Sequence, residues 1–165
     1  MVLDDIINQW NQSAIKYTEF ESTSRYSFFC RAFISDYFTN IQELRVLDAG
    51  CGNGIFTNIL SQNGGEVIGC DGSVEMLRIA RESYPQYRFD SVDLLASTPY
   101  SDMEFDVVFC NLVLMDIDPI DAIIVEFNRI LNKNGTLFFS IIHPAFYHAD
   151  WERMSRKYAL YSNCD

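Results

Sequence analysis

The sequence predicts an α/β domain with a doubly wound, mostly parallel sheet and two helices at its N-terminus. Three observations carry this prediction: apolar segments of strand length alternate with helical segments, a glycine-rich turn follows the first strand, and 48% of the 165 residues are hydrophobic. That composition supplies one substantial core and leaves little for a second. We expect a single domain over residues 1–165, with a helical cap at 1–43, a sheet core at 44–147 and the start of a truncated C-terminal region at 148–165.

Two amphipathic helices are expected before the sheet. In the first, apolar side chains recur at helical spacing at Ile6, Trp10, Ala14 and Tyr17. After a polar break the same spacing returns at Phe28, Phe29, Ala32, Phe33 and Tyr37. Two N-terminal helices therefore precede everything else.

The rest of the chain alternates between strands and helices. In order, the segments are strand 44–48, helix 55–62, strand 66–71, helix 73–83, strand 87–92, strand 105–111, helix 119–131 and strand 136–142. This alternation predicts parallel strands with right-handed crossovers and helices on both faces. Ser73 and Asp118 are expected to cap the helices that follow them, and Asn134 with Gly135 to turn the chain into the last strand.

Charge and composition exclude several classes of partner. The formal charge of −11 repels a polyphosphate backbone, so we expect no nucleic-acid partner. The longest apolar stretch, 107–115, is interrupted by Asn111 and is too short to span a bilayer, and the first residues lack the pattern of a signal peptide. The five cysteines form no CxxC pair. We therefore expect a reduced, cytoplasmic protein with no membrane partner.

A glycine-rich turn, Asp48-Ala-Gly-Cys-Gly-Asn-Gly54, joins the first strand to its helix. Glycines have no Cβ and tolerate positive φ, so the turn can present its amides to a ligand at the carboxyl edge of the sheet. Asp71 ends the next strand, where a carboxylate can accept hydrogen bonds from ribose hydroxyls. Together the turn and this acid predict a nucleoside site.

Asp48 distinguishes between two kinds of nucleoside ligand. A carboxylate before the turn would repel the pyrophosphate of a dinucleotide, whereas S-adenosylmethionine carries an ammonium and a sulfonium centre. Two interpretations of Asp48 stay open at this point. It can contact the cationic ligand directly, or it can brace the turn by bonding the backbone.

The ordered motifs resemble those of the class I S-adenosylmethionine-dependent methyltransferases, which have a Rossmann-like fold. Asp48–Gly54 resembles the family's first motif, Val67–Ser73 the second, Phe89–Leu94 the segment with an acid near the adenine, and Phe105–Asn111 the fourth strand. Segments 112–118, 131–137 and 140–146 look like the branch that methylates small molecules. The resemblance spans about residues 10–147.

The resemblance implies S-adenosylmethionine as cofactor, S-adenosylhomocysteine as product and a small-molecule methyl acceptor. Gly50, Gly52 and Gly54 would lie against the methionine part, Asp71 would hold the ribose hydroxyls and Asp93 the adenine amino group. Asn111 would face the methionine part or the acceptor. The implied cofactor-binding set also contains Asp48, Ala49, Cys51, Gly72, Met76 and Leu94.

Tyr17 is a further candidate from the N-terminal helix. By resemblance it closes over the cofactor. The alternative is that Tyr17 and Trp10 only pack in the core.

Methyl transfer from a sulfonium is an in-line displacement that alignment and desolvation can accelerate without a base. If the acceptor must lose a proton, His143 at the end of the last predicted strand is the first candidate base, and Asp116 is the second. The alternative for His143 is an imidazole bonded to the backbone. Two histidines with no convergent cysteine or carboxylate pattern predict no metal site.

Members of the family normally continue past the fifth strand through a helix and an antiparallel strand pair. This sequence ends at Asp165, so we expect those last strands to be missing and a second copy or another partner to cover the sheet edge. Two alternatives follow. One is a truncated module that binds the cofactor but is inactive or depends on a partner. The other, suggested by the sheet and glycine turn alone, is an NAD-dependent oxidoreductase.

Overall fold

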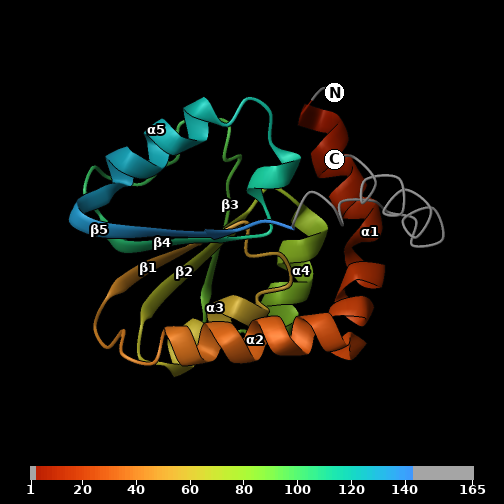
Figure 1. The fold of residues 1–165 in the computed structure, drawn as a ribbon. Helices are drawn as coiled ribbons and strands as arrows, with labels where there is room; N and C mark the ends of the chain where they lie inside the picture. Colours follow the sequence, from red (N-terminus) through yellow and green to blue (C-terminus); the bar gives the residue numbers. More distant parts are fainter. Residues whose placement is uncertain (1–2, 143–165) are drawn as a thin grey trace, which may run out of the picture.

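The computed structural model describes residues 3–142, in which a central parallel sheet lies between two helical layers (Figure 1). The strands are β1 (Arg45–Ala49), β2 (Glu66–Asp71), β3 (Arg88–Ser91), β4 (Phe105–Asn111) and β5 (Leu131–Ser140). They pair in the order β3-β2-β1-β4-β5, and every pairing is parallel. The predicted doubly wound α/β fold is confirmed. Since the strand order reverses between β1 and β4, the loops after these two strands diverge and open a crevice.

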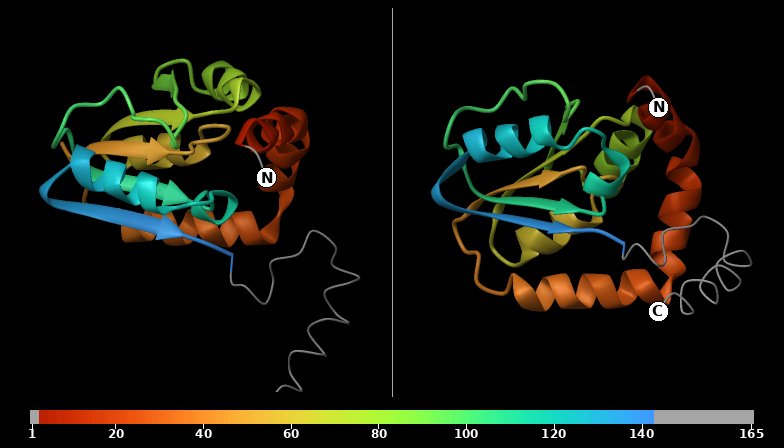
Figure 2. Two further views of the ribbon diagram at one scale, coloured as in Figure 1. Left: turned by 90° about the horizontal axis from the view of Figure 1, so that it is seen from above. Right: turned by 45° about the horizontal axis from the view of Figure 1, so that its top comes forward.

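Six helical segments accompany the sheet in the described part of the chain. They are α1 (Leu3–Thr23), α2 (Arg25–Tyr37), α3 (Ile55–Gln62), α4 (Val74–Ser83), the short 3-10 helix η1 (Leu114–Asp116) and α5 (Asp121–Ile130). The two predicted N-terminal helices are confirmed. α5 covers one face of the sheet and α2 and α3 the other, while α1 crosses the carboxyl ends of the strands (Figure 2). Among residues 3–142, no helix has the length and apolar character that crossing a bilayer requires.

Successive side chains of each central strand pack on opposite faces of the sheet. Leu47 and Val108 pack beneath α5, in one cluster with Phe127. Their neighbours Val46 and Phe109 belong to the cluster beneath α2 and α3. Strands buried on both faces read as continuous apolar runs, which is why β1 and β4 could be located in the sequence.

Two helix starts test the predicted caps. The Ser73 hydroxyl accepts a hydrogen bond from the amide of Met76 at 3.2 Å, so the predicted cap of α4 is confirmed. The predicted cap at Asp118 is wrong. α5 begins at Asp121, and the capping position belongs to Ile120, whose helical backbone and apolar side chain provide no cap. Asp121 instead places a negative charge in the first turn, where the helix dipole favours it.

The last strand starts earlier than predicted. β5 begins at Leu131, directly after α5, rather than at Thr136. Its pairing with β4 changes register between Leu131 and Thr136, so the turn residues Asn134 and Gly135 form an irregularity within the strand. The outer edge of β5 pairs with no other strand among residues 3–142, and a partner covering that edge stays a prediction.

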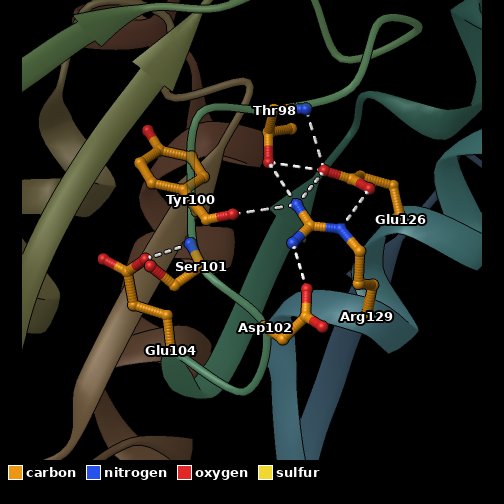
Figure 3. Close-up of polar contacts among 7 residues, drawn as sticks. All are labelled: Thr98, Tyr100, Ser101, Asp102, Glu104, Glu126 and Arg129. Atoms are coloured by element: carbon orange, nitrogen blue, oxygen red, sulfur yellow. Dashed lines mark hydrogen bonds and ion pairs between the residues drawn. The ribbon is translucent and has the colours of Figure 1, made fainter.

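The loop between β3 and β4 is tied to α5 by one arginine (Figure 3). The guanidinium of Arg129 donates to the Tyr100 carbonyl at 2.9 Å and to Asp102 at 2.6 Å, and its Nε donates to Glu126 at 2.8 Å. Glu126 also accepts from the amide and hydroxyl of Thr98 at 2.8 and 2.6 Å. This network fixes the long crossover on the α5 face.

Replacing Glu126 tests the network. Hydrogen bonds from Arg129 and Thr98 lower the pKa of Glu126 to about 2. Because the folded state favours the ionised form, this stabilisation is present above the ordinary carboxyl pKa of about 4.3 and is lost as the pH falls toward 2. We expect Glu126→Gln to cost on the order of 2 kcal/mol of unfolding free energy at pH 7, measured by urea titration, and less at pH 3. Glu82→Gln, in an exposed pair with Arg78, is the control. The same cost at both pH values would contradict the network's role.

Candidate functional site

A cavity lies at the carboxyl edge of the sheet, where α1 passes over the loops that follow β1, β2, β3 and β4. Its walls come from five separate parts of the chain: 6–21, 50–56, 71–76, 92–95 and 111–117. The strand order brings these loops to one place, although they are far apart in the sequence. A crevice at this switch point is where α/β sheets bind ligands.

The turn after β1 is held tightly against its neighbours. The amides of Gly50 and Cys51 both donate to the Cys70 carbonyl, at 2.8 and 2.9 Å. Gly50 has φ +76°, and a Cβ there would overlap the side chain of Val113. Gly52 has φ +52°, and a Cβ there would meet no clash, because its nearest neighbour would be the Met76 sulfur at 3.9 Å, an ordinary van der Waals contact. Packing therefore requires glycine at position 50, whereas Gly52 leaves the cavity open.

Asp71 joins two of the loops. Its Oδ2 accepts from the amide of Gly52 at 2.9 Å, and its Oδ1 accepts from the amide of Ser73 at 2.7 Å. Burial raises the pKa of Asp71, and these backbone hydrogen bonds oppose the rise. An ionised carboxylate has about four acceptor positions, so Asp71 keeps capacity to bind a ligand from the cavity it lines.

Asp48 lies beneath the turn and does not line the cavity. Its side chain is 2% exposed, and its Oδ2 accepts a hydrogen bond from the Thr57 hydroxyl at 2.6 Å. Burial raises the pKa of Asp48 to about 7; the bond from Thr57 opposes this, and the charges of Asp71 and Glu21 add to it. This placement favours bracing over direct contact with the ligand, but the hydrogen bond comes from the Thr57 hydroxyl of α3 and not from the backbone of the turn.

Most of the predicted cofactor-binding residues meet in the cavity. Those that line it are Tyr17, Gly50, Cys51, Gly52, Asp71, Gly72, Met76, Asp93, Leu94 and Asn111. Ala49 is buried in β1, and Gly54 occupies the position before α3, so neither is among the lining residues. Of the candidate bases, Asp116 lines the cavity and His143 lies outside the described residues.

Asn111 is oriented by its neighbours at the end of β4. The Ser140 hydroxyl donates to Asn111 Oδ1 at 2.6 Å, and the Cys30 thiol approaches the same oxygen at 3.9 Å. With this oxygen engaged, the amide NH₂ of Asn111 supplies the donors that can face the cavity.

The two interpretations of Tyr17 turn out to be compatible. Its ring meets that of Trp10 edge-on, with centroids 5.2 Å apart, and both residues line the cavity. Burial, followed by the charge of Glu21, raises the pKa of Tyr17, so the phenol stays protonated.

Glu21 and Asn53 are lining residues that the sequence did not single out as part of the site. Glu21 of α1 is 4% exposed, and its Oε2 accepts from the amide nitrogen of Asn53 at 2.6 Å. The available signal was helical spacing, because Glu21 lies one turn after Tyr17 on the same face of α1. Asn53 gave no signal beyond its place in the glycine turn.

The cavity is acidic. Four carboxylates line it, from Glu21, Asp71, Asp93 and Asp116, and the described lining residues include no lysine, arginine or histidine. Such a surface repels phosphate groups and attracts cations. The open turn, the acceptors on its nucleoside side and this charge fit the predicted S-adenosylmethionine and do not fit a dinucleotide.

Two other kinds of chemistry, at a metal site and at a reactive cysteine, have little support in residues 3–142. No cluster of histidine, cysteine or carboxylate side chains there has the arrangement of a metal site. Cys30, Cys51, Cys70 and Cys110 are free thiols. Burial raises the pKa of the Cys110 thiol to about 12, which leaves it protonated and unreactive.

Comparison with known proteins agrees with the geometry. A family model described as a methyltransferase domain matches residues 47–139. The malonyl-[acyl-carrier protein] O-methyltransferase of Hamiltonella defensa is 31% identical over 103 residues, covering 62% of this chain and 40% of that protein. The ubiquinone biosynthesis O-methyltransferase of Methylococcus capsulatus is 31% identical over 111 residues, covering 64% of this chain and 46% of that protein.

A solved structure shares both fold and sequence. The crystal structure of an S-adenosylmethionine-dependent methyltransferase from Mesorhizobium loti has a TM-score of 0.60 and 27% identity, over 65% of this chain and 50% of that one. The chain thus spans half or less of the length of all three proteins.

The buried Asp48 makes stability depend on pH. Its pKa of about 7 in the folded state lies above its ordinary value of about 3.9, so stability falls as the pH rises through that interval. Asp48→Asn keeps the shape without the charge. The test measures the unfolding free energy of the variant and of the parent by urea titration at pH 5 and at pH 8. We expect the value of the variant minus that of the parent to be higher at pH 8 than at pH 5 by on the order of 2 kcal/mol.

The exposed carboxylate of Asp36 on α2 provides the matched control for this experiment, as Asp36→Asn. A difference for Asp48→Asn that does not change with pH would show that Asp48 is not held in the buried environment described above.

Proposed function

This chain belongs to the class I S-adenosylmethionine-dependent methyltransferases, and we propose that it binds S-adenosylmethionine in the cavity under α1 and transfers its methyl group to a small-molecule acceptor. The observation that carries the proposal is the junction of an open glycine turn with carboxylates from neighbouring loops in one acidic cavity.

The residues divide between the two halves of the cofactor. Asp71 ends β2 and Asp93 follows β3, and we assign the nucleoside to them. Asp71 has acceptor capacity for the ribose hydroxyls. Asp93 uses Oδ1 to accept from the Leu95 amide at 2.9 Å, which leaves Oδ2 for the adenine amino group. The methionine part then lies over the turn after β1 and toward Asn111 at the end of β4.

When bound, the cofactor supplies a methyl group on a sulfonium that is already a good leaving group. The chain's contribution is to align the acceptor and exclude water. Asn111 lines the cavity at the end of β4, where its amide can orient the methionine part of the cofactor. The Trp10–Tyr17 pair covers the cavity from α1. Asp116 stands in η1, where it can take a proton from an acceptor. A role for His143 as base stays a proposal.

A groove beside the cofactor cavity suits the acceptor. It lies between α1 and η1, shares Trp10, Tyr17 and Asp116 with the cavity, and adds the side chains of Phe20 and Met115. Its walls combine these apolar side chains with the polar side chains of Gln9, Lys16 and Asp118, which suits an acceptor with an apolar body and polar substituents. The names of the two relatives refer to O-methylation, which supports an oxygen as the methylated atom.

A second candidate is a module that binds the cofactor without turnover. We consider this candidate because the chain spans half or less of the length of these three related proteins. The two candidates differ in one result: transfer of labelled methyl from S-adenosylmethionine to small molecules of a cell extract supports the enzyme, and tight binding without transfer supports the module.

Gly52→Ala tests cofactor binding. The added Cβ would enter the cavity with one ordinary van der Waals contact, to the Met76 sulfur at 3.9 Å, at a backbone conformation that costs alanine about 1 kcal/mol. We expect the variant to fold and its affinity for S-adenosylmethionine to fall more than tenfold by calorimetry. Absence of binding by the parent chain, or binding of NAD in its place, would contradict the proposed function.

A further inference from the structure

Glu21 is a buried carboxylate with one oxygen that receives no hydrogen bond from the described residues. It is 4% exposed, and its Oε2 accepts from Asn53 at 2.6 Å. Its Oε1 has no hydrogen-bond partner among residues 3–142 and is not among the fully enclosed polar atoms. Glu21 lines the cavity, and this oxygen is the acceptor that its side chain has left to offer a ligand there.

A positive charge beside Glu21 would stabilise its ionised carboxylate. Burial raises its pKa, while the bond from Asn53 and the more distant charge of Arg31 on α2 oppose the rise. Asp48 lies near enough for the charge of Glu21 to raise its pKa. A carboxylate in such a place is costly unless it is paired, and a cationic ligand would pair it.

The position of Glu21 along the sheet edge selects one part of the ligand. Its partner Asn53 belongs to the turn after β1. Its charge also raises the pKa of Cys30, whose thiol approaches Asn111 at the end of β4. Glu21 therefore lies beside the turn after β1 and close to the end of β4, on the side assigned to the methionine part.

Resting on the proposed function, we propose that Glu21 binds the α-ammonium group of the cofactor's methionine part through its Oε1. An ammonium offers N–H donors for a charge-assisted hydrogen bond, whereas a sulfonium has none. The contact would join α1 to the turn through the ligand, because the same carboxylate holds Asn53 with its other oxygen. α1 would then act as part of the binding site and not only as a cover.

The test compares ligands with and without the amino acid part. Glu21→Gln keeps the shape and can still accept from Asn53. We expect calorimetry to show about 10- to 100-fold weaker binding of S-adenosylmethionine and S-adenosylhomocysteine, and less than about a twofold change for 5′-methylthioadenosine, which has no ammonium. Glu19→Gln, exposed on the same helix, should leave all three affinities unchanged.

A second measurement changes the ligand in place of the protein. S-adenosylhomocysteine that lacks its amino group should bind the parent more weakly than complete S-adenosylhomocysteine does, by the factor that Glu21→Gln causes for the complete ligand. The Glu21→Gln variant should bind the ligand without the amino group as well as the parent does. Unchanged binding of S-adenosylmethionine by the variant would overturn the inference. So would an equal loss for 5′-methylthioadenosine, which indicates a structural role, or a loss for S-adenosylmethionine alone, which indicates a sulfonium contact. If the parent binds none of these ligands, the proposed function fails instead.

Discussion

The two hydrogen bonds that Asp71 accepts from the backbone hold the candidate site together. One comes from Gly52 in the turn after β1 and the other from Ser73 at the start of α4. Through them a single carboxylate sets the distance between two loops that follow neighbouring strands. The turn can come this close only because Gly50 has no side chain where Val113 packs. The position of the cavity depends on this junction, and the strand order brings the remaining walls to it.

The acidity of the site has opposite effects on stability and on binding. Asp48, Asp71 and Glu21 all have raised pKa values because burial disfavours their charged forms. A cation bound in the cavity would favour the ionised carboxylates and offset part of this cost. A ligand with a net positive charge therefore gains an advantage here over a neutral or anionic one with the same nucleoside. Sites that bind or react often retain groups that destabilise the empty fold.

Features that follow from local sequence were predictable. The glycine turn, the acid that ends β2 and the cap at Ser73 each depend on a few adjacent residues, and the structure places all three as expected. The family assignment followed from the order of these motifs and is confirmed. The start of β5 was misplaced because a turn sequence can be absorbed as an irregularity within a strand. α5 was also misplaced, since it begins at Asp121 and not at Pro119.

Features that depend on distant packing were not predictable. Glu21 lies thirty-two positions before Asn53, and only the fold shows that α1 crosses the turn. The choice between contact and bracing for Asp48 likewise required the position of Thr57 in α3. The direct test of a cofactor cavity at this edge is an NMR titration of the isotope-labelled chain with S-adenosylmethionine. We expect the amide shifts to change mainly in α1 and in the loops after β1 to β4, around Gly52 and Asp71. Shifts that do not change, or that change chiefly around Arg129 at the α5 network, would contradict it.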